Sequence, residues 1–149
     1  MSNRYAELRR RQQEVFSSLP ISYAFGIGQF NEMMQEWGLD PDADVDKIYS
    51  IGNGGYIRKA DADLMHQAFD LLHEELQAAI AQDTTGSGFI YEMFLCELAD
   101  HEYGYTQDVG ETLDALGYTL DDIRGNPRLK RGLQKAAKKI SGSVVNWLV

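Results

Sequence analysis

Apolar residues recur at every third or fourth position between Asp61 and Gln82, and this spacing is the clearest pattern in the chain. The recurring positions are Met65, Phe69, Leu72, Leu76 and Ile80. Because an α-helix turns once in about 3.6 residues, these side chains share one face of a helix. The pattern therefore predicts a long amphipathic helix.

A second segment, from Phe89 to Tyr103, is apolar on nearly every side. Such a pattern is typical of a helix buried at the centre of a domain, so we expect the core there. Weaker stripes and capping residues predict the remaining helices. They cover residues 4–18, 27–37 and 126–140, with short helices beginning near Asp108 and Thr119.

Asn53 and Gly54 separate two runs of β-prone residues, 47–52 and 55–58. An Asn-Gly pair readily adopts the positive φ angles of a tight turn, so these runs predict a small β-hairpin. A lone hairpin is marginally stable in water, and we therefore expect its apolar side chains to pack on a helix.

The fold class expected from the whole pattern is mainly α, or α+β in the wider sense, with about six helices and one hairpin. We expect residues 1–149 to form a single domain, because that length is typical of one. Within it, the patterns predict a peripheral N-terminal helix over residues 1–20 and a basic C-terminal helix and tail over residues 126–149.

Acidic and basic residues are segregated along the chain. Between Gly26 and Asp122 there are 21 acidic residues against three basic ones, whereas the segment 123–149 has seven basic residues and no acidic one. An acidic surface repels nucleic acid and anionic lipid and attracts basic surfaces, over a range of roughly 8 Å at physiological salt. The middle of the chain therefore favours a basic protein partner.

Other features narrow the class of protein. No apolar run approaches the roughly 20 residues of a membrane span, and the N-terminal segment lacks the apolar core of a secretory signal. We expect a cytoplasmic protein without a membrane partner. The turn from Gly52 to Gly55 matches neither the phosphate loop nor the dinucleotide fingerprint, so no cofactor is expected. The single cysteine, Cys96, excludes an internal disulfide.

Two groups of residues suit chemistry. Glu97 and His101 lie one helical turn apart, which fits general acid–base catalysis if the carboxylate is buried, and equally fits a structural hydrogen-bonded pair. The second group places two imidazoles and two carboxylates on one helix flank: Asp63, His66, Asp70 and His73. A single helix leaves a metal's coordination shell incomplete, so we expect no metal site.

The basic residues near the C-terminus form a third group, which suits nucleic acid. They are Arg124, Arg128, Lys130, Arg131, Lys135, Lys138 and Lys139. The short helices that precede them loosely suggest a helix-turn-helix. Pairing of the basic helix with the acidic surface of the same chain is the simpler interpretation, because that surface repels nucleic acid.

Several stretches of the chain carry a resemblance: SYAFGIGQF, SIGNGGYIRK, DTTGSGFIYEMFLCELADHEYGYTQD, ETLDALG and NPRLKRGLQKA. Together they resemble a family of small acidic proteins of gut-type bacteria and their mobile elements, for which no activity is established. The resemblance implies a context rather than a site. Small acidic proteins of mobile elements are often inhibitors of host defence, including antirestriction and anti-CRISPR proteins, some of which mimic the charge of DNA.

The leading hypothesis is a non-enzymatic protein whose acidic face occupies the basic surface of another protein, such as a nucleic-acid-binding protein. The carboxylates assigned to this face are Asp42, Asp44, Asp46, Asp61, Asp63, Asp70 and Glu74. One alternative is a small hydrolase or metal-dependent enzyme that uses Glu97, His101, His66 and His73. Another is a nucleic-acid-binding regulator that acts through the basic C-terminal helix.

Overall fold

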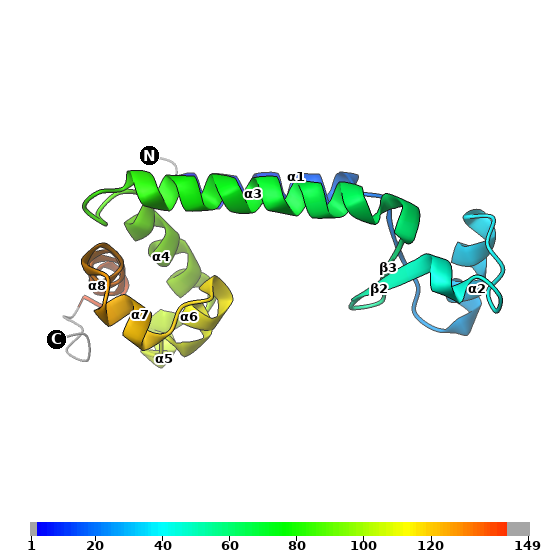
Figure 1. Cartoon of the computed structure of the whole chain (residues 1–149). Coiled ribbons are helices and arrows are strands. Elements are labelled where there is room, and N and C mark those ends of the chain that lie inside the picture. Colours follow the sequence, from blue (N-terminus) through cyan, green and yellow to red (C-terminus); the bar gives the residue numbers. More distant parts are fainter. Residues whose placement is uncertain (1–2, 143–149) are drawn as a thin grey trace. The chain divides into compact units, whose positions relative to one another are not determined.

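The computed structural model describes residues 3–142 and is 68% helical, with eight helices and a small three-stranded antiparallel sheet (Figure 1). The helices are α1 (Arg4–Ser18), α2 (Ile27–Glu36), α3 (Ala62–Gln82), α4 (Phe89–Asp100), α5 (Tyr103–Thr106), α6 (Gly110–Leu116), α7 (Leu120–Arg124) and α8 (Pro127–Ser141). The strands are β1 (Ile21–Tyr23), β2 (Ile48–Gly52) and β3 (Gly55–Arg58). The prediction of a mainly α fold with a small β part is confirmed.

The sheet has the strand order β1-β3-β2, and both pairs of strands are antiparallel. The predicted hairpin between β2 and β3 is present, and its turn residues Asn53 and Gly54 have φ angles of 53° and 79°. Strand β1 is a correction to the prediction of a hairpin alone. It is three residues long, which is too short to show an alternating pattern in the sequence.

The described chain divides into two compact units. Unit 1 contains the described residues up to Arg11 and from Glu74 onward, and unit 2 contains Gln12–His73. The boundaries between the units therefore fall within α1 and α3. The expectation that residues 1–149 form a single domain stays a prediction.

The core of unit 1 is built on α4, as the sequence predicts. Ile90, Met93, Phe94 and Leu98 of this helix are completely buried. Helix α8 packs against α4 at Gly132, where an added Cβ would lie 2.5 Å from the side chain of Ile90. The absence of a side chain at this position allows the two helices to approach closely.

The N-terminal helix, predicted to be peripheral, buries Tyr5 and Leu8 within unit 1. Few apolar residues are sufficient for this packing, because the buried side of the helix consists of Tyr5 and Leu8 in its first two turns. The predicted tail beyond Gly142 lies outside the described residues.

The core of unit 2 joins α2 to the sheet. Met33 and Met34 of α2 are buried together with Ile48 of β2, and Phe30 and Trp37 pack against this cluster. The weaker stripe that predicts a helix over residues 27–37 is therefore its buried face. Ile27, the first residue of α2, is 81% exposed. Within residues 3–142, no helix combines the length and apolar character that a membrane crossing needs.

Candidate functional site

The buried carboxylate of Glu97 lies at the centre of a polar cluster in unit 1. The Tyr5 hydroxyl donates a hydrogen bond of 2.6 Å to Glu97 Oε1, and Arg9 Nη1 lies 3.4 Å from the same oxygen. His101 Nε2 lies 3.4 Å from Glu97 Oε2. The structure therefore brings Glu97 and His101 together, as their spacing predicts, and adds two partners from α1.

These partners fix the position of the Glu97 carboxylate. Burial and the hydrogen bond to Glu97 raise the pKa of the Tyr5 phenol, so Tyr5 stays a donor. Arg9 also pairs with Asp100, and His101 Nδ1 lies 3.6 Å from Glu111. Among the described residues, no buried polar side-chain atom lacks a hydrogen-bond partner. The geometry is that of a clamp between α1 and α4, and catalysis by Glu97 and His101 stays an alternative hypothesis.

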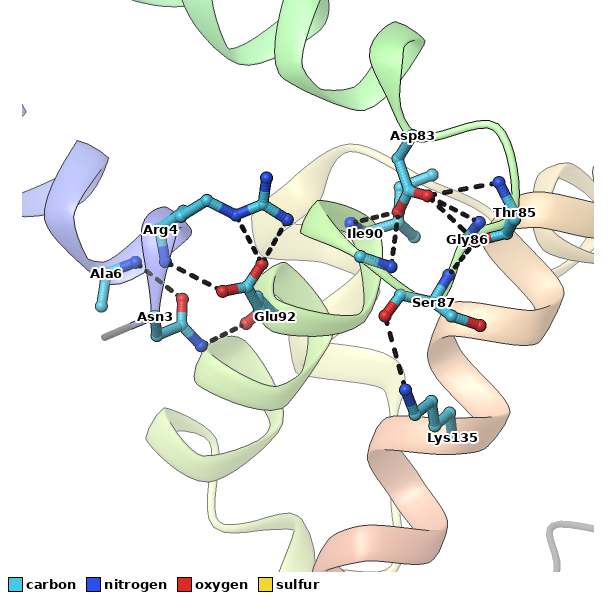
Figure 2. A network of polar contacts seen from close by, with 11 residues as sticks. Asn3, Arg4, Ala6, Asp83, Thr85, Gly86, Ser87, Ile90, Glu92 and Lys135 are labelled. Carbon is cyan, nitrogen blue, oxygen red and sulfur yellow. Dashed lines mark hydrogen bonds and ion pairs between the residues drawn. The ribbon is translucent and has the colours of Figure 1, made fainter. Parts of the chain in front are cut away.

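A second set of contacts fixes the start of α1 to α4 (Figure 2). Arg4 Nε donates a hydrogen bond of 2.8 Å to Glu92 Oε2, and Asn3 Nδ2 donates one of 2.8 Å to the Glu92 carbonyl. The same region holds Cys96, which is half-buried and has Arg9 Nη1 3.7 Å from its sulfur. Burial, supported by Asp100, raises the pKa of the Cys96 thiol despite this cation. The thiol therefore has little nucleophilic character.

The residues considered for a metal all lie on α3 in unit 2 and are exposed: Asp63, His66, Asp70 and His73. In the part of the chain that the structure describes, no three histidine, cysteine, aspartate or glutamate side chains gather closely enough to hold a metal ion. The expectation that the protein binds no metal stays a prediction.

Three cations of α8 bind backbone carbonyl oxygens in the last turn of α3 and in the segment that joins α3 to α4. Arg128 Nη1 donates to the carbonyls of Ile80 and Asp83 at 3.0 and 2.9 Å. Arg131 Nη1 donates to the Thr85 carbonyl at 3.3 Å. Lys135 Nζ donates to the Ser87 carbonyl at 3.4 Å (Figure 2). The carbonyls at the C-terminal end of a helix carry partial negative charge, which accounts for the attraction of Arg128 to the Ile80 carbonyl.

The predicted pairing of the basic helix with the acidic surface is wrong for α8. Within residues 3–142, none of its cations forms an ion pair with a carboxylate. The cation that does form one, Arg124, belongs to α7 and lies 3.6 Å from Asp121. Lys130, Lys138 and Lys139 consequently remain available to solvent or to a partner.

Asp83 organises the glycine-rich loop before α4 (Figure 2). Its Oδ1 accepts hydrogen bonds from the N–H groups of Thr85 and Gly86, and its Oδ2 accepts from those of Gly88 and Ile90. The protein's own carboxylate thus occupies the place where the N-terminus of a helix otherwise attracts an anion. The sequence analysis missed Asp83, although its position between a long helix and Thr84-Thr-Gly-Ser-Gly88 is a signal for a capping residue.

Replacing Asp83 by asparagine should lower the free energy of unfolding by about 1–2 kcal/mol at neutral pH. Burial opposes ionisation of Asp83, but its four N–H donors outweigh burial and lower the pKa of the carboxyl. A lowered folded-state pKa stabilises the protein above the unfolded value of about 3.9, and this contribution is lost as pH falls through the folded value. Urea unfolding at several pH values should therefore show a weaker loss of stability below about pH 4 in the variant.

The carboxylates assigned to the acidic face fall into two groups. Asp44 Oδ2 accepts a hydrogen bond from the Asp40 N–H, and Asp44 Oδ1 lies 3.0 Å from Lys47 Nζ. Asp61 lies 2.8 Å from Arg58 Nε. The side chains of the other five form no hydrogen bond or ion pair with the described residues: Asp42, Asp46, Asp63, Asp70 and Glu74. All of them except Glu74 belong to unit 2.

Unit 2 also exposes large apolar side chains, of which the sequence analysis named Phe69 as part of the apolar stripe of the long helix. They are Tyr23, Phe25, Ile27, Val45, Tyr49, Leu64, Phe69 and Leu71, with exposed fractions from 39% to 81%. In the rest of the described chain only Tyr105 and Leu120 are comparably exposed. Unit 2 contains ten acidic and three basic residues, so its apolar surface lies within a strongly negative environment.

The fold defines a mostly α-helical protein that has a small antiparallel sheet and, within the described residues, a structural polar cluster around Glu97. The chain belongs to DUF7659, a family of unknown function, whose sequence model matches residues 4–139. No curated protein and no solved structure matches the chain.

Proposed function

We propose that this protein is a non-enzymatic interaction protein that binds a basic surface of another protein through unit 2. The observation that carries the proposal is the combination of unpaired carboxylates with exposed large apolar side chains in this unit. The unit has ten acidic residues against three basic ones, and all three cations already contact its own side chains.

The apolar side chains distinguish a binding surface from an acidic surface that serves solubility alone. Carboxylates keep a protein soluble without any exposed phenylalanine or isoleucine. Phe25, which lies between β1 and α2, is 67% exposed, and Ile27, the first residue of α2, is 81% exposed. Gathered apolar groups at a protein surface indicate contact with a partner, and aromatic residues are enriched at the centres of protein interfaces.

A finer form of the proposal concerns the identity of the partner. Carboxylates spread over helices approximate the charge density of B-DNA, which carries one phosphate per roughly 1.7 Å of helix axis. The basic surface would then be the nucleic-acid-binding face of a protein, such as a nuclease of host defence. The support for this antirestriction or anti-CRISPR type of role is the acidic composition of the chain and its resemblance to proteins of mobile elements.

One observation favours a second candidate, nucleic-acid binding through α8. Lys130, Lys138 and Lys139 make no ion pair within the described residues, so their charges are available to phosphates. Four carboxylates on the neighbouring short helices would repel the same polymer: Glu111, Asp114, Asp121 and Asp122. We therefore rank this candidate below the binding of a basic protein.

Charge reversal tests the proposal. A fluorescein-labelled peptide, in which lysine and arginine flank a central phenylalanine, should bind the wild-type protein and lose affinity steeply as salt rises. Replacing Asp63 and Asp70 by lysine should weaken binding by about tenfold at low salt. The matched control replaces Glu102 and Asp114 of unit 1 by lysine, which changes the net charge equally and should have a much smaller effect.

Fluorescence anisotropy gives the affinities, and circular dichroism checks that each variant stays folded. Equal losses in the two charge-reversed variants would mean that total charge, not unit 2, determines binding, and would contradict the proposal. Binding of a labelled DNA duplex in place of the peptide, abolished by replacing Lys130 and Lys138 with glutamate, would establish the second candidate instead.

A further inference from the structure

An open groove of about 210 Å³ lies on the surface of unit 2. It is bordered by α1, β1, the β2–β3 turn and α3, and its apolar lining residues are Phe16, Tyr23, Ile51, Met65 and Phe69. The rings of Phe16 and Phe69 stack with their centroids 6.2 Å apart and their planes 23° from parallel. We call this feature the aromatic groove.

The apolar surface continues past the groove onto the hairpin turn. The ring of Phe25 lies so close to Gly54 that a Cβ at that glycine would overlap it. Gly54 follows Asn53, which lines the groove, and the Gly54 carbonyl accepts a hydrogen bond of 2.9 Å from the Ala24 N–H. The turn therefore holds Phe25 beside the groove, where its side chain is 67% exposed.

The dimensions of the aromatic groove suit one large side chain. A buried apolar cavity of about 150 Å³ accommodates a benzene molecule. A groove of about 210 Å³ consequently has room for a leucine, phenylalanine or tryptophan side chain from a partner. Aromatic walls around such an anchor are typical of the few contacts that contribute most of the affinity at an interface.

The charges around the aromatic groove favour a cationic partner. No basic residue lines it, and Asp70, which directly follows the lining residue Phe69, is exposed and forms no ion pair within the described residues. The three cations of unit 2 are engaged elsewhere. Lys47 pairs with Asp44, Arg58 pairs with Asp61, and Lys59 lies 4.9 Å from the centre of the Tyr49 ring.

We propose that the aromatic groove is the docking site for a lysine- or arginine-rich segment of a partner protein, which inserts one large apolar side chain between Tyr23 and Phe69. The inference rests on the proposed function and specifies where and how the partner binds. Charge attracts the segment over long distances, and the apolar anchor fixes its position. A groove that recognises such a segment discriminates against DNA, which carries neither the positive charge nor the anchor.

Two peptides test this docking mode. The first is the labelled peptide described above, and the second has alanine in place of its central phenylalanine and the same charge. The wild-type protein should bind the first at least about tenfold more tightly, since loss of a central anchor typically costs more than 1 kcal/mol. Tyr23→Ser should remove most of this difference. Tyr105→Ser, which changes the same residue type at a 90% exposed position in unit 1, should preserve it.

Nuclear magnetic resonance shifts of the wild-type protein provide a measurement that needs no variant. The phenylalanine peptide should shift the signals of Tyr23, Ile51 and Phe69 more than those of α8. Equal, salt-dependent binding of both peptides would overturn the aromatic groove as a docking site while leaving the proposed function intact. Absence of binding by either peptide at low salt would overturn both, and so would preferential binding of a DNA duplex.

Discussion

Replacing Phe94 by alanine should lower the free energy of unfolding by about 3–5 kcal/mol. Phe94 has no exposed surface, and its ring lies 6.4 Å from that of Tyr118 in the interior of unit 1. Truncation removes the buried ring and leaves a cavity, because closely packed neighbours relax only in part. Urea unfolding followed by circular dichroism measures the change.

Asp114→Ala is the control for this measurement. Asp114 is exposed on α6 and its side chain forms no hydrogen bond or ion pair with residues 3–142, so the change should be below about 0.5 kcal/mol. Small and equal effects at the two positions would show that α4 is not the centre of the core. If the unfolding curve instead showed two transitions and Phe94→Ala shifted only one of them, the two units would unfold separately.

Local signals account for the parts of the fold that the sequence predicts correctly. The start of the final helix follows from a capping residue, since the Asn126 side chain accepts hydrogen bonds from the N–H groups of Arg128 and Leu129. The helix predicted to begin near Thr119 likewise has a capping box, formed by Thr119 and Asp122. These interactions join residues that are close in sequence, so a short sequence motif is sufficient to predict them.

Features that depend on distant residues escape sequence reasoning. Strand β1 exists because Ile21 pairs with Ile57, and nothing within its three residues marks it as a strand. The aromatic groove combines residues from both ends of unit 2, such as Phe16 and Phe69. Their proximity follows from the packing of α1 on α3 and cannot be derived from the periodicity of either helix alone.

The candidate sites show the same limit. The spacing of Glu97 and His101 predicts their proximity, but Tyr5 lies 92 positions away and reaches Glu97 only through the fold. Charge patterns also mislead about α8. They suggest carboxylates as partners, whereas Arg128 binds the backbone carbonyl oxygens of Ile80 and Asp83. Because every residue has such a carbonyl, the sequence does not indicate which ones bind a cation.

Replacing Glu97 by alanine should lower the free energy of unfolding by about 2–4 kcal/mol. The substitution removes the acceptor of the Tyr5 hydroxyl and one carboxylate partner of Arg9. Tyr5 would be left with an unsatisfied buried donor, which is the main cost. Arg9 is partly exposed and keeps Asp100, so the loss should remain below that of a fully buried ion pair.

A double-mutant cycle of Tyr5→Phe and Glu97→Leu, in which leucine offers no acceptor, separates the structural role of this cluster from a catalytic one. If the cluster is a clamp, each change should destabilise the protein, and the coupling between them should be about 0.5–3 kcal/mol, because the two side chains share one hydrogen bond. A carboxylate retained for catalysis often costs stability, so its replacement is neutral or stabilising. Unchanged or increased stability of Glu97→Leu would therefore contradict the clamp and favour the enzymatic alternative built on Glu97 and His101.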